Sequence, residues 1–238
     1  MNRNVLIVGA SGDIGIAIAE QLSNEGYQLL LHYNSNRKGI ENFLSSARED
    51  AVLDVIQADL STDEGISHFL SNIHLPVDSI VFASGTANFG LFQETPEAVM
   101  DRMLTLHVKA VWMISKHLLG PMIHRKTGKI VLITSVWGEA GASNEVIYSS
   151  VKGAQNSFVK ALAKETGPSG INVNAVSPGF IETKMNGHLT LEERSAISGE
   201  IPLNRPGDPM EVAHAVSFLL DGKSAYIQGE IINVTGGW

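Results

Sequence analysis

The sequence predicts one α/β domain, a parallel sheet with helices on both faces in the doubly wound arrangement. Short apolar runs alternate with longer segments of helical periodicity along the whole chain, a pattern typical of parallel sheets covered on both sides. The first apolar run leads directly into a glycine-rich turn and then into a helical segment. No linker, repeat or low-complexity stretch divides the 238 residues, and a hydrophobic content of 44% can fill one large core.

Each element is predicted by its own stretch of sequence. Short apolar runs rich in β-branched residues are typical of buried parallel strands. Seven such runs predict a seven-stranded sheet, with strands near residues 4–8, 28–33, 52–57, 79–83, 129–134, 171–176 and 230–234. Helical periodicity fills the intervals near residues 14–25, 38–48, 62–73, 96–119, 146–166 and 208–220. The stretch 184–207 has the least regular pattern, and we expect it to form a lid over a bound substrate.

Composition argues against several classes of protein. The chain has no cysteine, which rules out disulfides and thiol chemistry and agrees with a reducing cytoplasm. The first strand is expected by residue 4, which leaves no room for a signal peptide, and no apolar run approaches the ~18 residues of a membrane span. A net charge of −8 argues against a general nucleic-acid binder. The eight histidines show no metal-ligand spacing, so no metal site is expected.

The glycine-rich turn predicts a dinucleotide site. It directly follows the first predicted strand and opens the first helix, an arrangement in which backbone N–H groups and a helix N-terminus face a phosphate. Gly9 permits a tight turn, and Gly15 permits close packing of the helix on the strand. This combination is typical of a Rossmann-type domain, although a glycine-rich loop can also be only a turn.

The loop after the second predicted strand indicates which nicotinamide cofactor would bind. Proteins that use NAD commonly place an acid here to hold the ribose 2′-hydroxyl. Residues 34–38 read Asn-Ser-Asn-Arg-Lys, and no acid occurs before Glu41. Because Arg37 and Lys38 suit a 2′-phosphate, NADPH is the predicted cofactor. The alternative is a solvated basic turn.

Ser135, Tyr148 and Lys152 form the pattern that carries chemistry. If residues 146–166 are helical, Tyr148 and Lys152 lie one turn apart on the same face. An ammonium group there favours the phenolate and is expected to lower the tyrosine pKa from its usual ~10. Tyr148 would then donate a proton to a carbonyl oxygen that Ser135 also hydrogen-bonds. The three residues predict reduction of a carbonyl group, and the alternative is an exposed tyrosine and lysine on a surface helix.

These motifs resemble those of the short-chain dehydrogenase/reductase family, and the resemblance runs the full length of the chain. Residues 8–15 match the family's T-G-x-x-x-G-x-G, with Val8 in place of the threonine and Asp13 in place of the middle glycine. Because a carboxylate beside a pyrophosphate is unfavourable, we expect Asp13 to point away from it. The resemblance implies a single domain over residues 1–238, with the cofactor half at about 1–130 and the catalytic and substrate part at about 131–238.

The resemblance also implies which residues contact the cofactor. Asp59 matches the family residue at the adenine, and residues 177–183 match the segment that walls the nicotinamide pocket. Lys152 would bind the nicotinamide ribose as well as act on Tyr148. The implied cofactor-binding set is Gly9, Ser11, Gly12, Asp13, Ile14, Gly15, Asn34, Ser35, Arg37, Asp59, Leu60, Ser84, Gly85, Tyr148, Lys152, Pro178, Gly179, Ile181 and Thr183.

One departure from the family falls on a residue implied in catalysis. The family has a helical asparagine that holds a water, which passes protons towards the lysine, and His107 occupies this position. Histidine donates and accepts hydrogen bonds and titrates near pH ~6.5, so we expect His107 to serve in the same relay. The alternative is a partly buried histidine that only packs.

Within the family, the chain most resembles bacterial 3-oxoacyl-acyl-carrier-protein reductases. The resemblance rests on residues 177–183, 201–205 and 226–230, and it implies a carbonyl substrate carried by an acidic protein. Lys126 and Lys129 are the basic residues available to hold that partner. The resemblance also implies a homotetramer.

Two alternatives stay open. Glu139 and Glu145 flank the expected substrate pocket, and unless they face solvent, such carboxylates suit an amine-bearing ketone. The segment that contains them and the Gly-Gly-Trp end resemble a Firmicute-type subgroup suggested to reduce an aminopentanone on a lysine of elongation factor P. The other alternative is a non-catalytic NADP-binding regulator.

Overall fold

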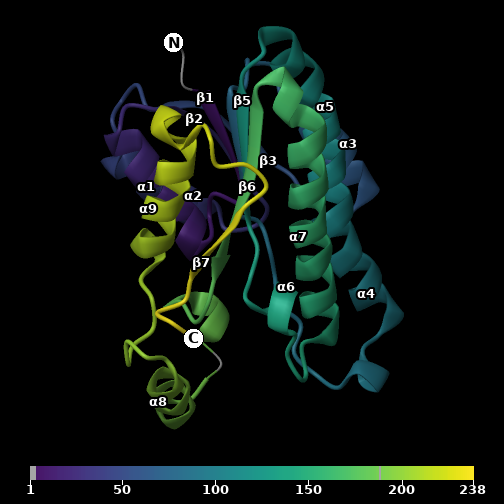
Figure 1. Cartoon of the computed structure of the whole chain (residues 1–238), viewed down its shortest axis with the longest axis vertical. Coiled ribbons are helices and arrows are strands. Elements are labelled where there is room, and N and C mark those ends of the chain that lie inside the picture. Colours follow the sequence, from purple (N-terminus) through teal and green to yellow (C-terminus); the bar gives the residue numbers. More distant parts are fainter. Residues whose placement is uncertain (1–3, 188) are drawn as a thin grey trace.

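Seven parallel strands form the centre of the molecule (Figure 1), and the computed structural model describes residues 4–187 and 189–238. The strands are β1 (Asn4–Val8), β2 (Gln28–Tyr33), β3 (Val52–Gln57), β4 (Ser79–Phe82), β5 (Gly128–Ile133), β6 (Ile171–Pro178) and β7 (Ile231–Val234). Their order is β3-β2-β1-β4-β5-β6-β7, so the winding reverses between β1 and β4. The predicted doubly wound, seven-stranded parallel sheet is confirmed.

Helices cover both faces of this sheet (Figure 1). One face carries α1 (Asp13–Asn24), α2 (Arg37–Ser46) and α9 (Pro209–Leu220). The other face carries α3 (Asp63–Ser71), α4 (Glu97–Leu104), α5 (Ala110–Arg125) and α7 (Val146–Thr166). Two further helices, α6 (Trp137–Ala140) and α8 (Leu191–Glu200), lie beyond the carboxyl ends of the strands. Among residues 4–187 and 189–238, no helix is both long and apolar enough to cross a membrane.

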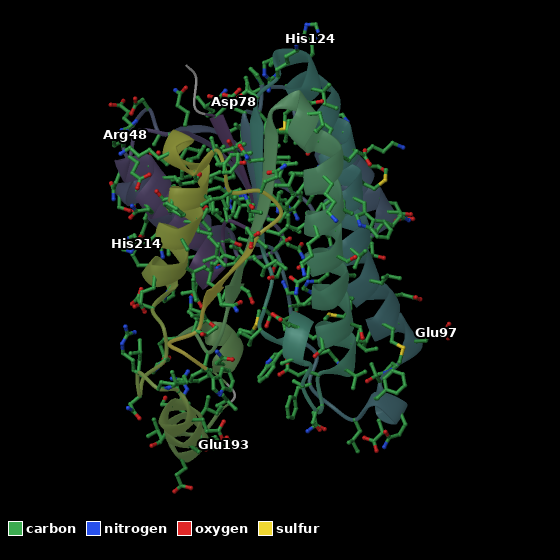
Figure 2. The ribbon with its side chains drawn as sticks, in the orientation of Figure 1. Arg48, Asp78, Glu97, His124, Glu193 and His214 are labelled. Carbon is green, nitrogen blue, oxygen red and sulfur yellow. The ribbon has the colours of Figure 1, made fainter. Side chains whose placement is uncertain are left out.

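The core has two layers because successive residues of a strand point to opposite faces of the sheet. In β1, Leu6 packs with the side chains of α3, α5 and α7, whereas Val5 and Ile7 pack with those of α1 and α9. All three β1 side chains are fully buried. Figure 2 shows side chains filling the space between the sheet and each helical layer. Packing on both faces of the sheet holds the ends of the strands and the starts of the helices in place, and the candidate site is formed by these segments.

The helix predicted over residues 96–119 is divided in the structure. It consists of α4, a π-helical turn (Thr105–Lys109) and α5. A π-helical turn inserts an extra residue into the helical repeat and often occurs at a functional site. His107 lies within this turn.

The segment 184–207, predicted to be irregular, contains α8. This helix has no buried residue, so it lacks the apolar stripe by which periodicity reveals a helix. Its sequence signal is a capping box, in which Thr190 and Glu193 bond each other's backbone N–H groups. His188, which belongs to the predicted lid, lies outside the described residues.

The two ends of the parallel strands can be located in Figure 2. Asp78, just before β4, and His124, near the end of α5, mark the amino-terminal ends of the strands, at the top of the view. Glu193 of α8 lies at the opposite end, beyond the carboxyl ends of the strands. Ligands of doubly wound sheets bind beyond the carboxyl ends, so the candidate site is sought there.

Candidate functional site

A cleft of about 930 Å³ opens beyond the carboxyl ends of β1 to β4. Its walls come from the four segments that follow these strands, from α4 and from residues 183–185. The predicted cofactor residues that line it are Gly9, Ser11, Gly12, Asp13, Ile14, Gly15, Asn34, Ser35, Asp59, Leu60, Ser84, Gly85 and Thr183. Motifs far apart in the sequence therefore converge on one concave site.

Two glycines shape the turn after β1. Gly9 has a φ of +88°, and a Cβ at this position would overlap the backbone of Ser84. A Cβ at Gly15 would overlap the carbonyl oxygen of Gly9. The turn consequently lies close to both α1 and the end of β4. The first-turn N–H groups of α1, which begins at Asp13, are at the cleft and can attract a phosphate.

His32, which was not among the predicted site residues, holds this turn in place. It lies near the end of β2 and is 2% exposed. Its Nδ1 accepts a hydrogen bond from the Gly9 N–H at 3.0 Å, and its Nε2 lies 3.1 Å from the Ala58 carbonyl oxygen, to which it donates. Burial lowers the pKa of His32 to about 4, so the ring is a neutral bridge at physiological pH. A histidine at the end of an apolar strand was the signal available in the sequence.

We expect His32 to make the protein less stable in acid. Because the folded pKa of about 4 lies below the ordinary 6.5, the unfolded chain binds more protons between these pH values. The stabilisation is complete above pH 6.5 and decreases by about 3 kcal/mol as the pH falls to about 4. Urea unfolding at several pH values in this window should show a weaker pH dependence of the unfolding free energy in His32→Gln than in the wild type.

The matched control for this measurement is His124→Gln. His124 is exposed on α5 (Figure 2), so this variant should keep the wild-type pH dependence. Equal pH dependence in the wild type and both variants would contradict the assigned role of the buried ring.

The loop after β2 contributes residues that differ in part from the predicted ones. Arg37 is not among the residues that line the cleft; its guanidinium pairs with Glu41 at 2.8 Å, one helical turn further along α2, and its contact with a cofactor stays a prediction. Asn36, which was not predicted, does line the cleft. Its amide donates to the Ser11 carbonyl at 2.7 Å and accepts from the Gly39 N–H at 3.1 Å. Asn36 therefore joins the two loops at this end of the cleft.

Asp59 and Arg102 lie near each other in the same cleft. The Asp59 carboxylate accepts hydrogen bonds from the Ser61 hydroxyl at 2.7 Å and the Ser61 N–H at 3.0 Å, and these bonds lower the pKa of Asp59. The positive charge of Arg102, on α4, lowers it further. Arg102 was also missed, because nothing in its helix distinguishes it in sequence from a surface arginine.

Asp13 makes a contact across the cleft. Its carboxylate accepts the backbone N–H of Lys184 at 2.7 Å and lies 3.6 Å from the Lys184 ammonium. The side chain is thus bonded to the first residue of the predicted lid segment, and its orientation away from a bound pyrophosphate stays a prediction. This contact ties the start of α1 to that segment.

Ser135, Tyr148 and Lys152 come together beyond the carboxyl ends of the strands, as the cleft does. Ser135 follows β5, and the other two residues lie one turn apart near the start of α7. A hydrogen bond links the Ser135 hydroxyl to the Tyr148 phenol. The Lys152 ammonium lies 5.6 Å from the centre of the Tyr148 ring and donates to the Ile133 carbonyl at 2.8 Å. The predicted catalytic residues form one cluster.

The predicted direction of the Tyr148 pKa is wrong for this arrangement. Burial raises the pKa to about 12, the Ser135 hydrogen bond opposes the increase, and the charge of Glu145 adds to it. Burial also lowers the pKa of Lys152 to about 7, and its ammonium bonds the Ile133 carbonyl. Sequence spacing indicates a shared helix face but not how much water each group loses. Tyr148 holds its proton at neutral pH, which is the state that a proton donor requires.

His107 lies between the cleft and Tyr148. It is fully buried, and its ring meets the Tyr148 ring edge-on, with centroids 5.9 Å apart. Its Nε2 lies 3.0 Å from the Thr86 carbonyl oxygen. Burial, followed by the charge of Lys152, lowers the pKa of His107 to about 3. The expectation that it titrates near neutral pH is therefore wrong, because sequence gave no measure of its burial.

The backbone of His107 is engaged as well. The Gln155 side chain donates to the His107 carbonyl at 2.7 Å. The Nδ1 of His107 and the Oε1 of Gln155 are buried without a hydrogen bond to the described part of the protein. Buried polar atoms of this kind commonly bind an internal water. The relay function of His107 stays a prediction, and its ring would serve there in the neutral form.

The end of β6 and the residues directly after it do not line the cleft. Gly179 donates to the Val234 carbonyl at 3.0 Å and packs so closely on Thr235 that a Cβ would lie 3.1 Å from its Cα. Ile181 is 4% exposed. Of the predicted nicotinamide segment, Thr183 is the residue that the structure brings to the cleft, whereas Pro178, Gly179 and Ile181 do not line it.

The two glutamates predicted to flank the substrate pocket differ in position. Glu145, just before α7, is close enough to Tyr148 for its charge to raise the tyrosine pKa. Glu139, on α6, is exposed. Of the two, Glu145 is the carboxylate whose charge acts on Tyr148, and its contact with a substrate stays a prediction.

Lys129 does not have the role proposed for it. It lies at the amino end of β5, where its ammonium donates to the carbonyls of Leu219 and Asp221 at 3.0 and 2.6 Å and to the Ser224 hydroxyl at 3.1 Å. These bonds cap the end of α9. Lys126 is exposed, but it also lies at the amino-terminal ends of the strands, whereas Ser135 of the same chain lies at their carboxyl ends.

The chain is similar to known proteins over nearly its whole length. A family model described as enoyl-(acyl carrier protein) reductase matches residues 9–238. An uncharacterised oxidoreductase, YmfI of Bacillus subtilis, is 46% identical, with 100% of this chain and 99% of that protein covered. The 3-oxoacyl-[acyl-carrier-protein] reductase FabG of Escherichia coli is 32% identical, with 98% and 95% covered.

A solved structure is similar in fold. It comes from Beutenbergia cavernae, is provisionally described as an NAD(P)-dependent gluconate 5-dehydrogenase, and contains NADP at low occupancy. It superposes with a TM-score of 0.92 at 26% identity, with 99% of this chain and 96% of that chain covered.

Proposed function

Because the chain belongs to the short-chain dehydrogenase/reductase family of oxidoreductases, we propose that it uses NADPH to reduce a ketone, with Tyr148 as the proton donor. The observation that carries this proposal is the cluster of Ser135, Tyr148 and Lys152 beside a glycine-walled cleft. A hydroxyl and a phenol that both reach one oxygen atom are suited to stabilise and protonate a developing alkoxide.

The cleft fits an extended dinucleotide phosphate. The turn after β1 leaves open space at Gly12, where a Cβ would have its nearest neighbour 3.8 Å away, and the N-terminus of α1 can receive a pyrophosphate. Asn34, Ser35 and Asn36 would surround the ribose 2′-position without an acid to repel a phosphate there. Bound NADP in the similar structure supports the same cofactor here. When bound, NADPH supplies a hydride to the carbonyl carbon and becomes NADP⁺.

The chain's own residues would handle the proton. As negative charge develops on the carbonyl oxygen, the Ser135 hydroxyl and the Tyr148 phenol donate hydrogen bonds to it. Tyr148 then transfers its proton, because an alkoxide is a stronger base than a phenolate. The positive charge of Lys152, 5.6 Å from the ring centre, would stabilise the phenolate until a proton returns.

Two substrate classes are proposed for this site. The first is a 3-oxoacyl thioester on a carrier protein, which the names of relatives at 32–34% identity support. The second is an amino-ketone, free or on a lysine of a protein such as elongation factor P, which the position of Glu145 beside Tyr148 supports. The engagement of Lys129 in capping α9 removes one of the two basic residues offered for carrier-protein binding.

The test is NADPH oxidation by the purified protein with each substrate class. We expect turnover of a ketone in at least one assay, and the class that reacts identifies the substrate. If the amino-ketone reacts, Glu145→Gln should lower kcat/KM for it about tenfold below the wild-type value, because a charge-assisted hydrogen bond is lost. Glu139→Gln is the matched control and should keep the wild-type kcat/KM. Tight NADPH binding without turnover of either class would instead favour a non-catalytic regulator.

A further inference from the structure

The last residue of the chain packs against the segment that follows Ser135. The rings of Trp238 and Trp137 lie 5.0 Å apart between centroids, with an interplanar angle of 70°. This edge-to-face geometry is favourable for aromatic pairs and adds to the energy of their burial. Figure 1 shows the C-terminus between α8 and α6, at the carboxyl edge of the sheet.

The C-terminal tail reaches this position through two glycines in the left-handed region. Gly236 has a φ of +69° and Gly237 a φ of +94°. A Cβ on Gly236 would lie 2.8 Å from Ile201 Cγ2, and one on Gly237 would lie 3.1 Å from Pro202 Cγ. The Leu203 N–H donates to the Gly236 carbonyl at 3.2 Å. The tail is therefore held by the residues that follow α8, at the end of the lid segment.

Trp137 connects this contact to the catalytic cluster. Its backbone N–H donates to the Ser135 hydroxyl oxygen at 3.3 Å. The next residue, Gly138, packs so closely on α7 that a Cβ would lie 2.8 Å from the Lys152 carbonyl carbon and 2.9 Å from Asn156 Nδ2. Helix α6 is wedged between the tail and α7, so a shift of Trp137 would also shift the hydroxyl of Ser135.

We propose that Trp238 is a positioning residue, whose ring holds Trp137 in place and thereby fixes the position of the Ser135 hydroxyl. We call this contact between Trp238 and Trp137 the clamp. Because the tail also packs against the end of the lid segment, Trp238 couples that segment to the clamp. Its kinetic consequence rests on the proposed function, whereas its structural consequence does not. In this role Trp238 touches no reacting atom. It acts by keeping the hydrogen-bond donor to the carbonyl oxygen at a fixed place.

The experiment compares Trp238→Ala and Trp238→Phe with the wild type by hydrogen exchange and by kinetics. In Trp238→Ala, we expect faster amide exchange in residues 135–141 and 190–203. We also expect kcat to fall about three- to tenfold while the KM for NADPH is unchanged, because the aromatic pair is lost but the cofactor cleft is not. Trp238→Phe should retain most of the wild-type exchange and kcat. Trp112→Phe, at an exposed position on α5, is the control and should change neither.

The outcomes separate this inference from the proposed function. Unchanged exchange in Trp238→Ala would overturn the clamp even if the enzyme reduces ketones. Faster exchange in a protein whose wild type reduces no ketone would support the clamp and reject the proposed function. A fall in kcat with an equal weakening of NADPH binding would also overturn the clamp, since it would indicate general loss of structure.

Discussion

Replacing Tyr148 by phenylalanine is expected to lower kcat by roughly 10²–10⁴-fold, the contribution typical of a general acid. The substitution removes one hydroxyl and keeps the ring, so the edge-on contact with His107 and the position of the Lys152 ammonium over the ring should persist. The glycine turn and the other walls of the cofactor cleft are untouched. NADPH affinity, measured by fluorescence titration, should therefore stay within about twofold of the wild type while steady-state turnover is lost.

The control for this variant is Tyr226→Phe, because the Tyr226 side chain is fully exposed. It should leave both kcat and NADPH affinity unchanged. Near-normal turnover by Tyr148→Phe would show that another group supplies the proton. A loss of NADPH affinity equal to the loss of kcat would show that Tyr148 acts mainly by holding the cofactor.

The fold was predictable because its signals are local and repeated. Each strand is a short apolar run, and alternation with helices leaves few topologies other than a covered parallel sheet. The one sizeable element that was missed, α8, buries none of its residues and therefore has no apolar stripe. Hydrophobic periodicity carries little information about a helix that is marked in sequence by its cap and not by a buried face.

The site was predictable where chemistry needs fixed residue types, and less so where it depends on burial. Gly9 and the Ser135, Tyr148 and Lys152 cluster lie where their motifs place them. The pKa of Tyr148 was predicted in the wrong direction because sequence does not indicate how completely the phenol and its lysine are removed from water. His32 was missed because its role is a hydrogen bond to a turn 23 positions away.

Partners of the chain stay predictions, since each depends on surfaces rather than motifs. The homotetramer, the carrier protein and elongation factor P are of this kind. The bonds of Lys129 to α9 show how such an expectation can fail, because a lysine that looks available in sequence is already used within the fold.

Replacing Gly9 by alanine is expected to destabilise the protein by about 2–5 kcal/mol and to abolish NADPH binding. The added methyl group would overlap the Ser84 backbone, which cannot give way as a flexible side chain could, and the φ of +88° is strained for any residue with a Cβ. Relief of this overlap would separate the turn after β1 from the end of β4 and break the hydrogen bond to His32. Urea unfolding and NADPH titration measure the two effects.

Gly12→Ala distinguishes this packing requirement from a general need for glycine in the turn. Gly12 caps α1 with an ordinary φ of −78°, and a Cβ there would be 3.8 Å from the Gly9 carbonyl oxygen, a normal contact. Its unfolding free energy should stay within about 1 kcal/mol of the wild type. Any loss of NADPH affinity in this variant would then report crowding of the phosphate and not a damaged fold. If Gly9→Ala were as stable as Gly12→Ala, the close approach of the turn to β4 would not be what shapes the cleft.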